Sequence, residues 1–453
     1  MLKNIWNRMS NRRRLLSGML LLACISAPVV LRDRAHVPFD QVTGTKPVLT
    51  EPRWHRLWPV FNPGRFVGWS DDHKKPETVS GLKISLFADK LFHPQWLYLL
   101  PNGDILVSES NAPISSRHKP GFLKRLFWHL TRREKDSSPD RIVLLRDSNH
   151  DGKADQKSIF IDNLHSPFGI ALKGDRLYVA TSDAILAYPY KGGEDHITAP
   201  AQQITTLPAG DINLNWTRNI LLSPDGRFLY VAVGSATNIA DKGMALEKER
   251  AAVWEIDLQN NSHRLYTTGL RNPVGMAFHP ETKALWSVVD ERDNVGSDMV
   301  PDYLTQLNEG DYYGWPQFYW GGYPDRHFKK IDKLTQSTVT WPDYSLGAHV
   351  APLALVFAHD PASGRVNLGD NFKNGAFISE HGSLYRYPWS GYQVVFVPFN
   401  DKGEATGKPI TVVKDFRQGN KVYGLPAGMT GDASGALLIA DEASNRIWRL
   451  SKD

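Results

Sequence analysis

The chain has 453 residues with a formal net charge of +5, and its 36 Gly, 29 Pro, 14 Trp and 16 Tyr are typical of short strands and tight turns. This composition argues against a protein built from long helices. Lysine and arginine are spread along the chain outside the N-terminus, without the clustered basic stripe of a nucleic-acid-binding protein, so a nucleic-acid partner is excluded.

The N-terminal segment, residues 1–31, has the pattern of an export signal. Lys3 and four arginines up to Arg14 precede an apolar run from Leu15 to Leu31, which is the charged-then-apolar order of such signals. A relaxed membrane span needs about 20 apolar residues, so both cleavage and a tight single anchor remain open. We therefore expect a periplasmic protein that this segment holds on a bacterial membrane.

Cys24 is the only cysteine of the chain and follows Leu21, Leu22 and Ala23. This short stretch resembles a bacterial lipoprotein processing site, which predicts lipidation of Cys24. The alternative is a small residue that falls within the apolar run by chance. In either case a single cysteine excludes a disulfide within the chain.

Residues 32–80 lack a clear periodicity and are rich in proline, tryptophan and charged residues. Such a composition predicts a linker or an irregular strap that crosses the surface of the domain. The folded domain is therefore expected over residues 81–453.

From residue 81 onward one pattern recurs: a corner that usually contains proline, a short apolar strand, a Gly or Asp-Gly turn and a second strand. A unit of this kind cannot bury both faces of its small sheet alone, so six units would close into a ring. We therefore predict an all-β, six-bladed β-propeller. Apolar positions alternate in Leu82–Phe87 and Arg446–Leu450, so strands from both chain ends are expected to pair in one blade. The corners lie near His93, Ser166, Asn215, Arg271, His349 and Leu425.

A candidate calcium loop begins at Asp147. Its oxygen ligands stand mostly at alternate positions, and Gly152 allows the sharp turn that calcium loops require. Position twelve is Ser158 instead of a glutamate that binds the ion with both oxygens, so a solvated Asp/Asn turn stays open as the alternative. An ion bound here would have a structural role. The predicted ligands are Asp147, Asn149, Asp151 and Asp155.

The segment from Thr268 to Trp320 carries the most informative motifs. It contains Leu270-Arg271-Asn272-Pro273, then the acidic loop Asp290-Glu291-Arg292-Asp293 with Asp302, then Tyr313-Gly314-Trp315-Pro316. In this order the motifs resemble the pyrroloquinoline-quinone-dependent glucose/sorbosone dehydrogenases, and the resemblance covers most of the chain from Leu82 onward. Further matching segments are Arg250-Ala251-Ala252, Gly347-Ala348-His349-Val350, Glu380-His381-Gly382-Ser383, Ser390-Gly391-Tyr392 and Val394–Phe399.

The resemblance implies a protein that binds pyrroloquinoline quinone and Ca²⁺ and passes hydride to the quinone from an aldose or a sugar-derived aldehyde. It does not identify the electron acceptor. Because the quinone is a flat tricarboxylate, its pocket needs Arg or Lys donors and a divalent cation. Arg271 and Asn272 match the pair beside the quinone and are candidate catalytic residues, although Arg271 could instead be a corner arginine paired with a carboxylate. The resemblance assigns cofactor binding to Arg271, Asn272, Glu291, Arg292, Asp293, Asp302, His349, His381 and Arg386.

The chain departs from the family pattern at two corners. Leu214 and Asn215 stand where the family has the histidine that takes the proton of the sugar hydroxyl, and neither side chain titrates near neutral pH. Leu425 replaces an arginine that contacts the cofactor. Asn215 thus occupies a catalytic position without the chemistry of a base, and His349 or His381 could in principle substitute. We expect weak or substrate-restricted dehydrogenase activity.

Two other functions remain open on the sequence. A propeller that has lost its redox site would bind a sugar or a protein partner, as the two departures would allow. A calcium-dependent lactonase would need Glu109, Asn272 and Asp290 to converge on one ion. The aromatic residues between Tyr312 and Tyr323 would either stack on sugar rings or, as aromatic residues more often do, fill the space between blades.

Overall fold

The computed structural model describes residue 19 and residues 33–53, 62, 64–70, 75–113, 138–328 and 333–453. Cys24 and all but one residue of the predicted export segment lie outside this part of the chain, so their roles stay predictions. Within the described ranges, no helix combines the length and the apolar character needed to cross a membrane.

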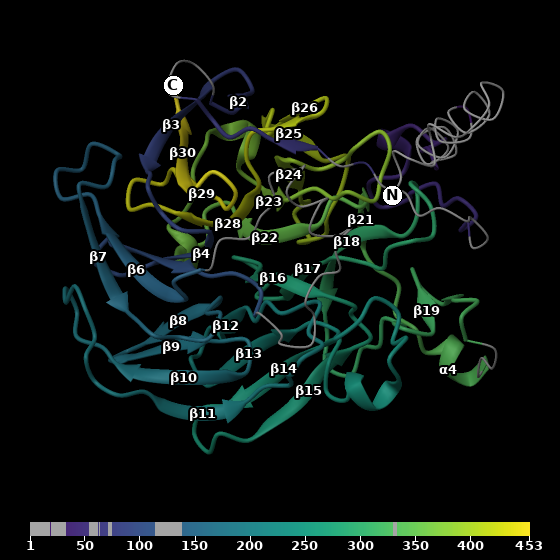
Figure 1. Ribbon diagram of the computed structural model, residues 1–453, viewed down its shortest axis with the longest axis horizontal. Coiled ribbons are helices and arrows are strands. Elements are labelled where there is room, and N and C mark those ends of the chain that lie inside the picture. The colour runs from purple at the N-terminus through teal and green to yellow at the C-terminus, as the bar shows by residue number, and fades with distance from the viewer. Residues whose placement is uncertain are drawn as a thin grey trace, which may run out of the picture.

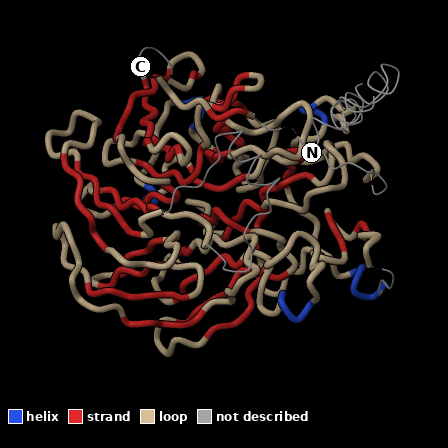
Figure 2. The backbone as a smooth tube through the Cα atoms, viewed as in Figure 1, coloured by secondary structure: helices blue, strands red, loops and turns tan. Residues whose placement is uncertain are grey.

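Short antiparallel strands make up nearly all of the regular structure (Figures 1 and 2), which confirms the predicted all-β fold. In the described part of the chain, six sheets have four or five strands each. We number these sheets as blades I to VI in chain order. Blades I and II are β4 (Pro94–Leu99), β5 (Ile105–Glu109), β6 (Arg141–Arg146) and β7 (Gln156–Ile161), then β8 (Ile170–Lys173), β9 (Arg176–Ala180), β10 (Ala184–Pro189) and β11 (Gln202–Thr206).

Blades III and IV are β12 (Ile220–Leu222), β13 (Phe228–Val233), β14 (Ala252–Asp257) and β15 (His263–Thr268), then β16 (Pro273–Phe278), β17 (Leu285–Val289), β18 (Pro301–Leu307) and β21 (Tyr344–Ala348). Blade V is β22 (Pro352–Phe357), β23 (Gly375–Glu380), β24 (Gln393–Pro398), β25 (Ile410–Lys414) and β2 (Glu77–Thr78). Blade VI is β28 (Pro426–Gly431), β29 (Leu437–Asp441), β30 (Arg446–Lys452) and β3 (Leu82–Ala88).

The remaining elements are short and lie outside the blades. The strands are β1 (Arg65–Phe66), β19 (Phe318–Tyr319), β20 (Tyr323–Pro324), β26 (Arg417–Gln418) and β27 (Lys421–Val422). The helices are η1 (Phe39–Gln41), η2 (Met244–Glu247), α4 (Lys333–Ser337), η3 (Pro361–Ser363) and η4 (Asp370–Phe372).

The first strands of the blades form the centre of a ring. β4, β8, β12, β16, β22 and β28 gather in the middle of Figure 1, and each contacts the next, with β28 returning to β4. Neighbouring strands approach so closely that a Cβ on Gly428 of β28 would lie 2.5 Å from the carbonyl oxygen of Gln95 in β4. At the other ends of the same two strands, Leu99 and Gly431 both lie beside Gly364. The inner strands therefore run in the same direction, with their first residues at one end of the ring.

The apolar core lies between the blades. In β5 the side chains alternate between two clusters: Val107 packs with Leu438 of blade VI, whereas Leu106 packs with Leu177 of blade II. This is the period-two pattern of a strand whose two faces are both covered. Each blade thus depends on both neighbours to bury its sheet.

Both ends of the folded domain meet in blade VI. β3 pairs antiparallel with β30, with Leu82 opposite Lys452 and Leu86 opposite Trp448. The predicted pairing of these two segments is confirmed, and it closes the ring with backbone hydrogen bonds.

The described residues of the predicted strap lie along blades IV to VI. Gly44 forms an isolated bridge with Ser345 of β21. Further along, Trp69 stacks on Tyr423 with 5.2 Å between ring centroids, and its Nε1 donates to Asp441 Oδ2 over 2.7 Å. These strap residues are therefore part of the packed structure, not only a loose tether.

The close contact of β28 with β4 gives a first prediction. Gly428→Ala would press a methyl group against backbone atoms of Gln95 and Trp96, and overpacking of this kind costs about 1–3 kcal/mol. We expect a lower midpoint in urea unfolding. Gly192→Ala is the matched control, because a Cβ there meets nothing within 4 Å. Equal midpoints for the two variants would contradict the tight packing of the ring.

Candidate functional site

The starts of the inner strands surround one mouth of the ring, and the strand register fixes which side chains stand there. Pro94, Pro273, Pro352 and Pro426 begin their strands, and each pairs with the last residue of the second strand of its blade. The residue before each proline and the residue after its partner therefore occupy equivalent places, which we call the rim. The rim residues are His93 and Ser110, Asn272 and Asp290, Ala351 and His381, and Leu425 and Glu442.

Arg271 and Asn272 belong to a buried polar cluster at the corner of blade IV. Nη1 of Arg271 donates to Asp290 Oδ2 over 2.8 Å, and Nη2 lies 3.4 Å from Asp293 Oδ2. Nδ2 of Asn272 lies 3.4 Å from the same Asp290 oxygen. Nε of Arg271 and Oδ1 of Asn272 are buried and have no hydrogen-bond partner in the described part of the chain. A ligand at the rim could satisfy these two atoms.

Burial and charge act in opposite directions on the acids of this cluster. Burial raises the pKa of Asp290, and the charge of Arg271 offsets only part of that effect. Burial opposes ionisation of Asp293 as well, but the hydrogen bond with His349 and the charge of Arg271 outweigh it and lower its pKa. Burial, with the charge of Asp290, raises the pKa of Asp302. Negative charge is therefore held most readily on Asp293.

His349 is fixed between two acceptors. Its Nδ1 lies 3.2 Å from Asp293 Oδ1, and its Nε2 lies 2.9 Å from the carbonyl oxygen of Gly296. Each ring nitrogen therefore faces an oxygen acceptor. Only 2% of the side chain is exposed. His349 thus lies beside the cluster, and neither of its ring nitrogens is without a partner.

The Asp302 carboxylate connects the acidic loop to blade V through two hydrogen bonds. Its Oδ1 accepts the amide of Glu291 over 2.8 Å, and its Oδ2 accepts the amide of Ala351 over 2.9 Å. Glu291 is buried and accepts the amide of Arg292 over 2.9 Å, and burial raises the pKa of Glu291 to about 7. Both oxygens of Asp302 are used by the backbone, so this residue positions the loop.

Two arginines that the resemblance assigns to the cofactor are paired with other acids. Arg292 forms a buried ion pair with Asp325, which follows β20. Arg386 lies 3.5 Å from Asp298 and stands over the ring of Phe39 in the strap, 5.1 Å from its centroid. Neither guanidinium is brought to Arg271 by these contacts.

Asn215 lies beside Asn272. A Cβ on Gly234 would be 2.5 Å from both Asn215 Cβ and Asn272 Oδ1, so only glycine leaves room for the two side chains to meet. Nδ2 of Asn215 donates to Ser235 Oγ over 2.8 Å. The neighbouring Leu214 is 56% exposed. Asn215, which the resemblance aligns with a proton acceptor, thus lies beside Gly234 together with Asn272 and carries an amide.

His381 belongs to a second group on the rim that the sequence did not single out. Its Nε2 lies 3.2 Å from Glu442 Oε2, and Nδ1 of His93 lies 3.5 Å from Glu442 Oε1. Burial opposes ionisation of Glu442, but the two imidazoles outweigh it and lower its pKa. The recurring corners could have revealed this group in the sequence, because His93 directly precedes the proline of its corner, as Asn272 does.

Aromatic side chains from three blades pack beside the rim. Trp96 and Phe168 have ring centroids 5.2 Å apart, and Phe168 meets Trp216 edge to face at 5.9 Å. Leu425 belongs to the same apolar cluster. Trp96 and Phe168 are buried and Trp216 is half-buried, so Trp216 is the ring of these three that a flat ligand at this mouth could reach.

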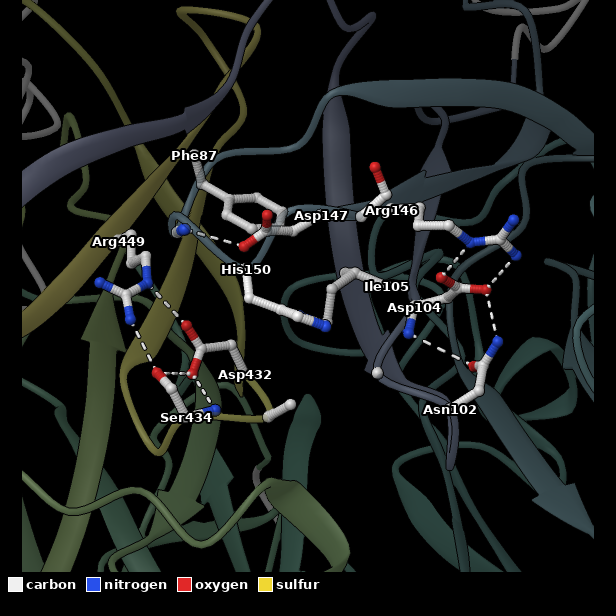
Figure 3. A pocket seen from close by; sticks show the side chains of 14 residues that line it. Phe87, Asn102, Asp104, Ile105, Arg146, Asp147, His150, Asp432, Ser434 and Arg449 are labelled. Carbon is white, nitrogen blue, oxygen red and sulfur yellow. Dashed lines mark hydrogen bonds and ion pairs between the residues drawn. The ribbon is translucent and has the colours of Figure 1, made fainter.

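The predicted calcium loop lies at the opposite end of the ring. It joins β6 to β7 and lines a cavity of about 490 Å³ between blades I and VI. Figure 3 shows Asp147 and His150 between two walls of this cavity. The labelled ion pairs on the walls are Arg146 with Asp104 and Arg449 with Asp432.

The carboxylates of this loop accept hydrogen bonds from the loop itself. Asp147 Oδ2 accepts the amide of Gly152 over 2.8 Å, and Asp151 Oδ1 accepts the amide of Lys153 over 2.9 Å. Asp155 Oδ2 accepts the hydroxyl of Ser148 over 2.7 Å. Within the described residues, no three His, Cys, Asp or Glu side chains are grouped as a metal site. An ion would have to compete with these hydrogen bonds.

Glu109, one of the three residues of the lactonase alternative, has partners of its own in blade I. Glu109 accepts Arg141 Nε over 2.7 Å and the amide of Phe92 over 2.9 Å, both within blade I and the segment that leads into it. Asn272 and Asp290 lie together in blade IV. The predicted aromatic stretch mostly fills the core, since Trp315, Phe318, Tyr319 and Trp320 are buried.

Comparisons with known proteins agree with this architecture. The model of the TrAA12-like family matches residues 141–312 and 316–453. An uncharacterized protein of Borreliella burgdorferi is 26% identical over 300 residues, which covers 63% of this chain and 76% of that protein. A pyrroloquinoline quinone-dependent sugar dehydrogenase of Hypocrea jecorina is 22% identical over 340 residues, 64% of this chain and 74% of that protein.

Solved structures share the fold at low identity. The calcium structure of a Trichoderma reesei enzyme of carbohydrate-active family AA12 is 18% identical with a TM-score of 0.67, covering 85% of this chain and 99% of that one. The holo form of a pyranose dehydrogenase PQQ domain from Coprinopsis cinerea is also 18% identical, with a TM-score of 0.64, covering 86% of this chain and 100% of that one.

The calcium loop gives a second prediction. If Ca²⁺ binds Asp151 in the native state only, a chelator lowers the melting temperature of the wild type, because ligand binding stabilises by about 2.7 kcal/mol at a hundredfold excess over Kd. Asp151→Asn keeps the turn acceptor and should remove this part of the shift. Asp162→Asn is the control, because Asp162 is an exposed residue that accepts the next backbone amide. Equal chelator shifts in wild type and Asp151→Asn would rule out the loop as the ion site.

Proposed function

The chain belongs to the TrAA12-like family, and on this basis we propose that it is a pyrroloquinoline-quinone-dependent oxidoreductase that acts on an aldose or a sugar-derived aldehyde. Relatives named as quinone-dependent sugar dehydrogenases support the proposal. The observation that carries it in this chain is the buried pair Arg271 and Asn272, whose Nε and Oδ1 atoms have no partner within the described residues.

The donor set fits one end of the quinone. The Arg271 guanidinium is almost fully buried, and the charges of Asp290 and Asp293 outweigh the effect of burial and raise its pKa, so it stays cationic. A buried cation with an unused N–H is suited to a carbonyl or carboxylate oxygen. Asn272 beside it would orient the ring, and the face of Trp216 would support it. When bound, the quinone supplies a two-electron acceptor for a hydride from the sugar.

Ca²⁺ is part of the same proposal. Four acids, Asp290, Glu291, Asp293 and Asp302, share this part of the rim with two arginines, Arg271 and Arg292, so acids outnumber arginines here. A divalent cation bound with the quinone would compensate that excess. Burial raises the pKa values of Asp290, Glu291 and Asp302, and a divalent cation beside them would oppose this effect.

Leu425 weakens the proposed cofactor site. Its side chain is 7% exposed and lies in the apolar cluster with Trp96 and Phe168. A carboxylate of the quinone would find no cation at this rim position. We therefore expect a lower quinone affinity than the family pattern implies, with weak or substrate-restricted activity.

A binding propeller without redox chemistry is the second candidate. Two observations favour it: Asn215 stands where the family has its proton acceptor, and Leu425 stands where it has an arginine. Such a protein would keep the mouth of the ring for a sugar or a protein partner. The two candidates differ in whether the rim binds the quinone.

Quinone titration separates these candidates. With Ca²⁺ present, wild-type protein should bind the quinone and oxidise an aldose in a dye-linked assay. Arg271→Lys keeps the positive charge but loses the planar set of N–H donors of the guanidinium. The Kd for the quinone should therefore rise about tenfold to a hundredfold, because one hydrogen bond to a charged group contributes about 1.5–3 kcal/mol. Arg227→Lys, at a half-exposed arginine paired with Asp257, is the control. A folded wild type without measurable quinone binding would refute the cofactor and favour the binding propeller.

We also propose that the protein is exported and held on the periplasmic side of the membrane by its N-terminal segment or by a lipid on Cys24. The basic residues before the apolar run support this location. Fractionation of cells should recover the native protein with the membrane. Recovery from the cytoplasm would contradict export, whereas unchanged membrane attachment of Cys24→Ala would contradict only the lipid.

A further inference from the structure

Glu442 stands between two imidazoles that come from neighbouring blades. His381 follows β23 of blade V, Glu442 follows β29 of blade VI, and His93 precedes β4 of blade I. Oε2 of Glu442 lies 3.2 Å from His381 Nε2 in a hydrogen bond. Oε1 lies 3.5 Å from His93 Nδ1, an ion-pair distance without the alignment of a hydrogen bond. The carboxylate is thus directed mainly at His381.

The contact with Glu442 decides which nitrogen of His381 is free. A carboxylate oxygen accepts hydrogen, so in the neutral ring Nε2 carries the proton and Nδ1 carries the lone pair. Within the described residues Nδ1 makes no hydrogen bond, and 25% of the side chain is exposed. His381 therefore offers an unshared lone pair at the mouth of the ring.

The alternatives at the site lack this property. His349 has both nitrogens on acceptors and is 2% exposed. Asn215 has an amide, which does not titrate near neutral pH. An imidazole held by a carboxylate is the arrangement in which a histidine takes a proton from a hydroxyl, because the carboxylate fixes the tautomer and stabilises the imidazolium that forms.

His381 also lies at the same end of the ring as Arg271 and Asn272. The strand register places it at the same rim position as Asp290, which contacts Arg271 and Asn272. Asp302 joins the two regions, because it accepts the amide of Ala351, whose own carbonyl accepts the amide of His381. One continuous set of backbone contacts therefore connects the quinone-type cluster with the histidine.

We infer that His381 Nδ1 is the proton acceptor of the dehydrogenase reaction and that Glu442 is its positioning residue. This inference rests on the proposed function. The substrate O–H bond breaks, and its proton goes to Nδ1. The C–H bond on the same carbon breaks with both electrons, and the hydrogen leaves as hydride to a quinone acceptor. The carbon–oxygen bond becomes double, so the sugar is oxidised by two electrons and the quinone is reduced by two.

Three variants test the assignment at saturating quinone. His381→Asn should lower kcat about 10²- to 10⁴-fold, the usual contribution of a general base, with the quinone Kd changed less than about threefold. Added imidazole should partly restore turnover to His381→Ala. His165→Asn is the matched control, because His165 also faces a carboxylate, Asp183 Oδ2 at 2.9 Å, but it stands one residue before the corner serine and is 56% exposed.

Glu442→Gln tests the positioning role without relying on turnover. In the quinone-free protein, ¹⁵N NMR of the His381 ring should show hydrogen on Nε2 and a lone pair on Nδ1. Glu442→Gln, which is similar in shape, should mix the two tautomers and lower kcat about tenfold. The melting temperature reports whether each variant is folded.

Several results would overturn the inference. One is an active, quinone-binding wild type whose His381→Asn variant keeps its kcat within about threefold. A loss of quinone affinity that accounts for the whole loss of activity would instead make His381 a cofactor ligand. A fall in kcat for His165→Asn without a fall for His381→Asn would instead indicate that the proton acceptor lies in blade II. A wild type that neither binds quinone nor oxidises any sugar would refute the proposed function together with the base.

Discussion

The contact between the inner strands is the constraint from which the rest of this structure follows. A single blade has apolar side chains on both faces of its sheet, as the alternation of Leu106 and Val107 between two clusters shows. Such a sheet is covered only when its neighbours stand close on both sides. At Gly428 the backbones approach so nearly that a Cβ would not fit. Because the inner strands share one direction, this packing also brings all their first residues to the same end.

The site forms because the inner strands all begin at the same end of the ring. Rim side chains from different blades meet because their strands begin together, not because they are near in sequence. Glu442 contacts the histidines of two other blades in this way, and Asn272 lies with Asn215 of the neighbouring blade beside Gly234. Polar groups that would be costly to bury alone are thereby held in mutual contact. The rigid ring sets their distances, which is a good basis for binding a flat, charged ligand.

The sequence predicts the strands better than it predicts the partners of the site residues. Proline corners and alternating apolar residues locate the starts of the inner strands, and the pairing of Leu82–Phe87 with the last strand follows from the same alternation. Arg292 and Arg386 show the limit: they pair with Asp325 and Asp298, two acids whose positions no spacing rule relates to them. His93 was visible as a corner residue. Its contact with Glu442 depends on the last blade standing beside the first, which is a property of the closed ring.

The pairing of β3 with β30 has a consequence for folding during synthesis. β3 finds its partner only when β30, more than 350 residues later, has been synthesised. Until then its paired edge is an open row of amides and carbonyls, with apolar side chains such as Leu82 and Ile84 that are buried in the finished ring. Open edges of this kind invite pairing with other chains. A chain that lacks β30 therefore leaves the edge of β3 open to pairing with other chains.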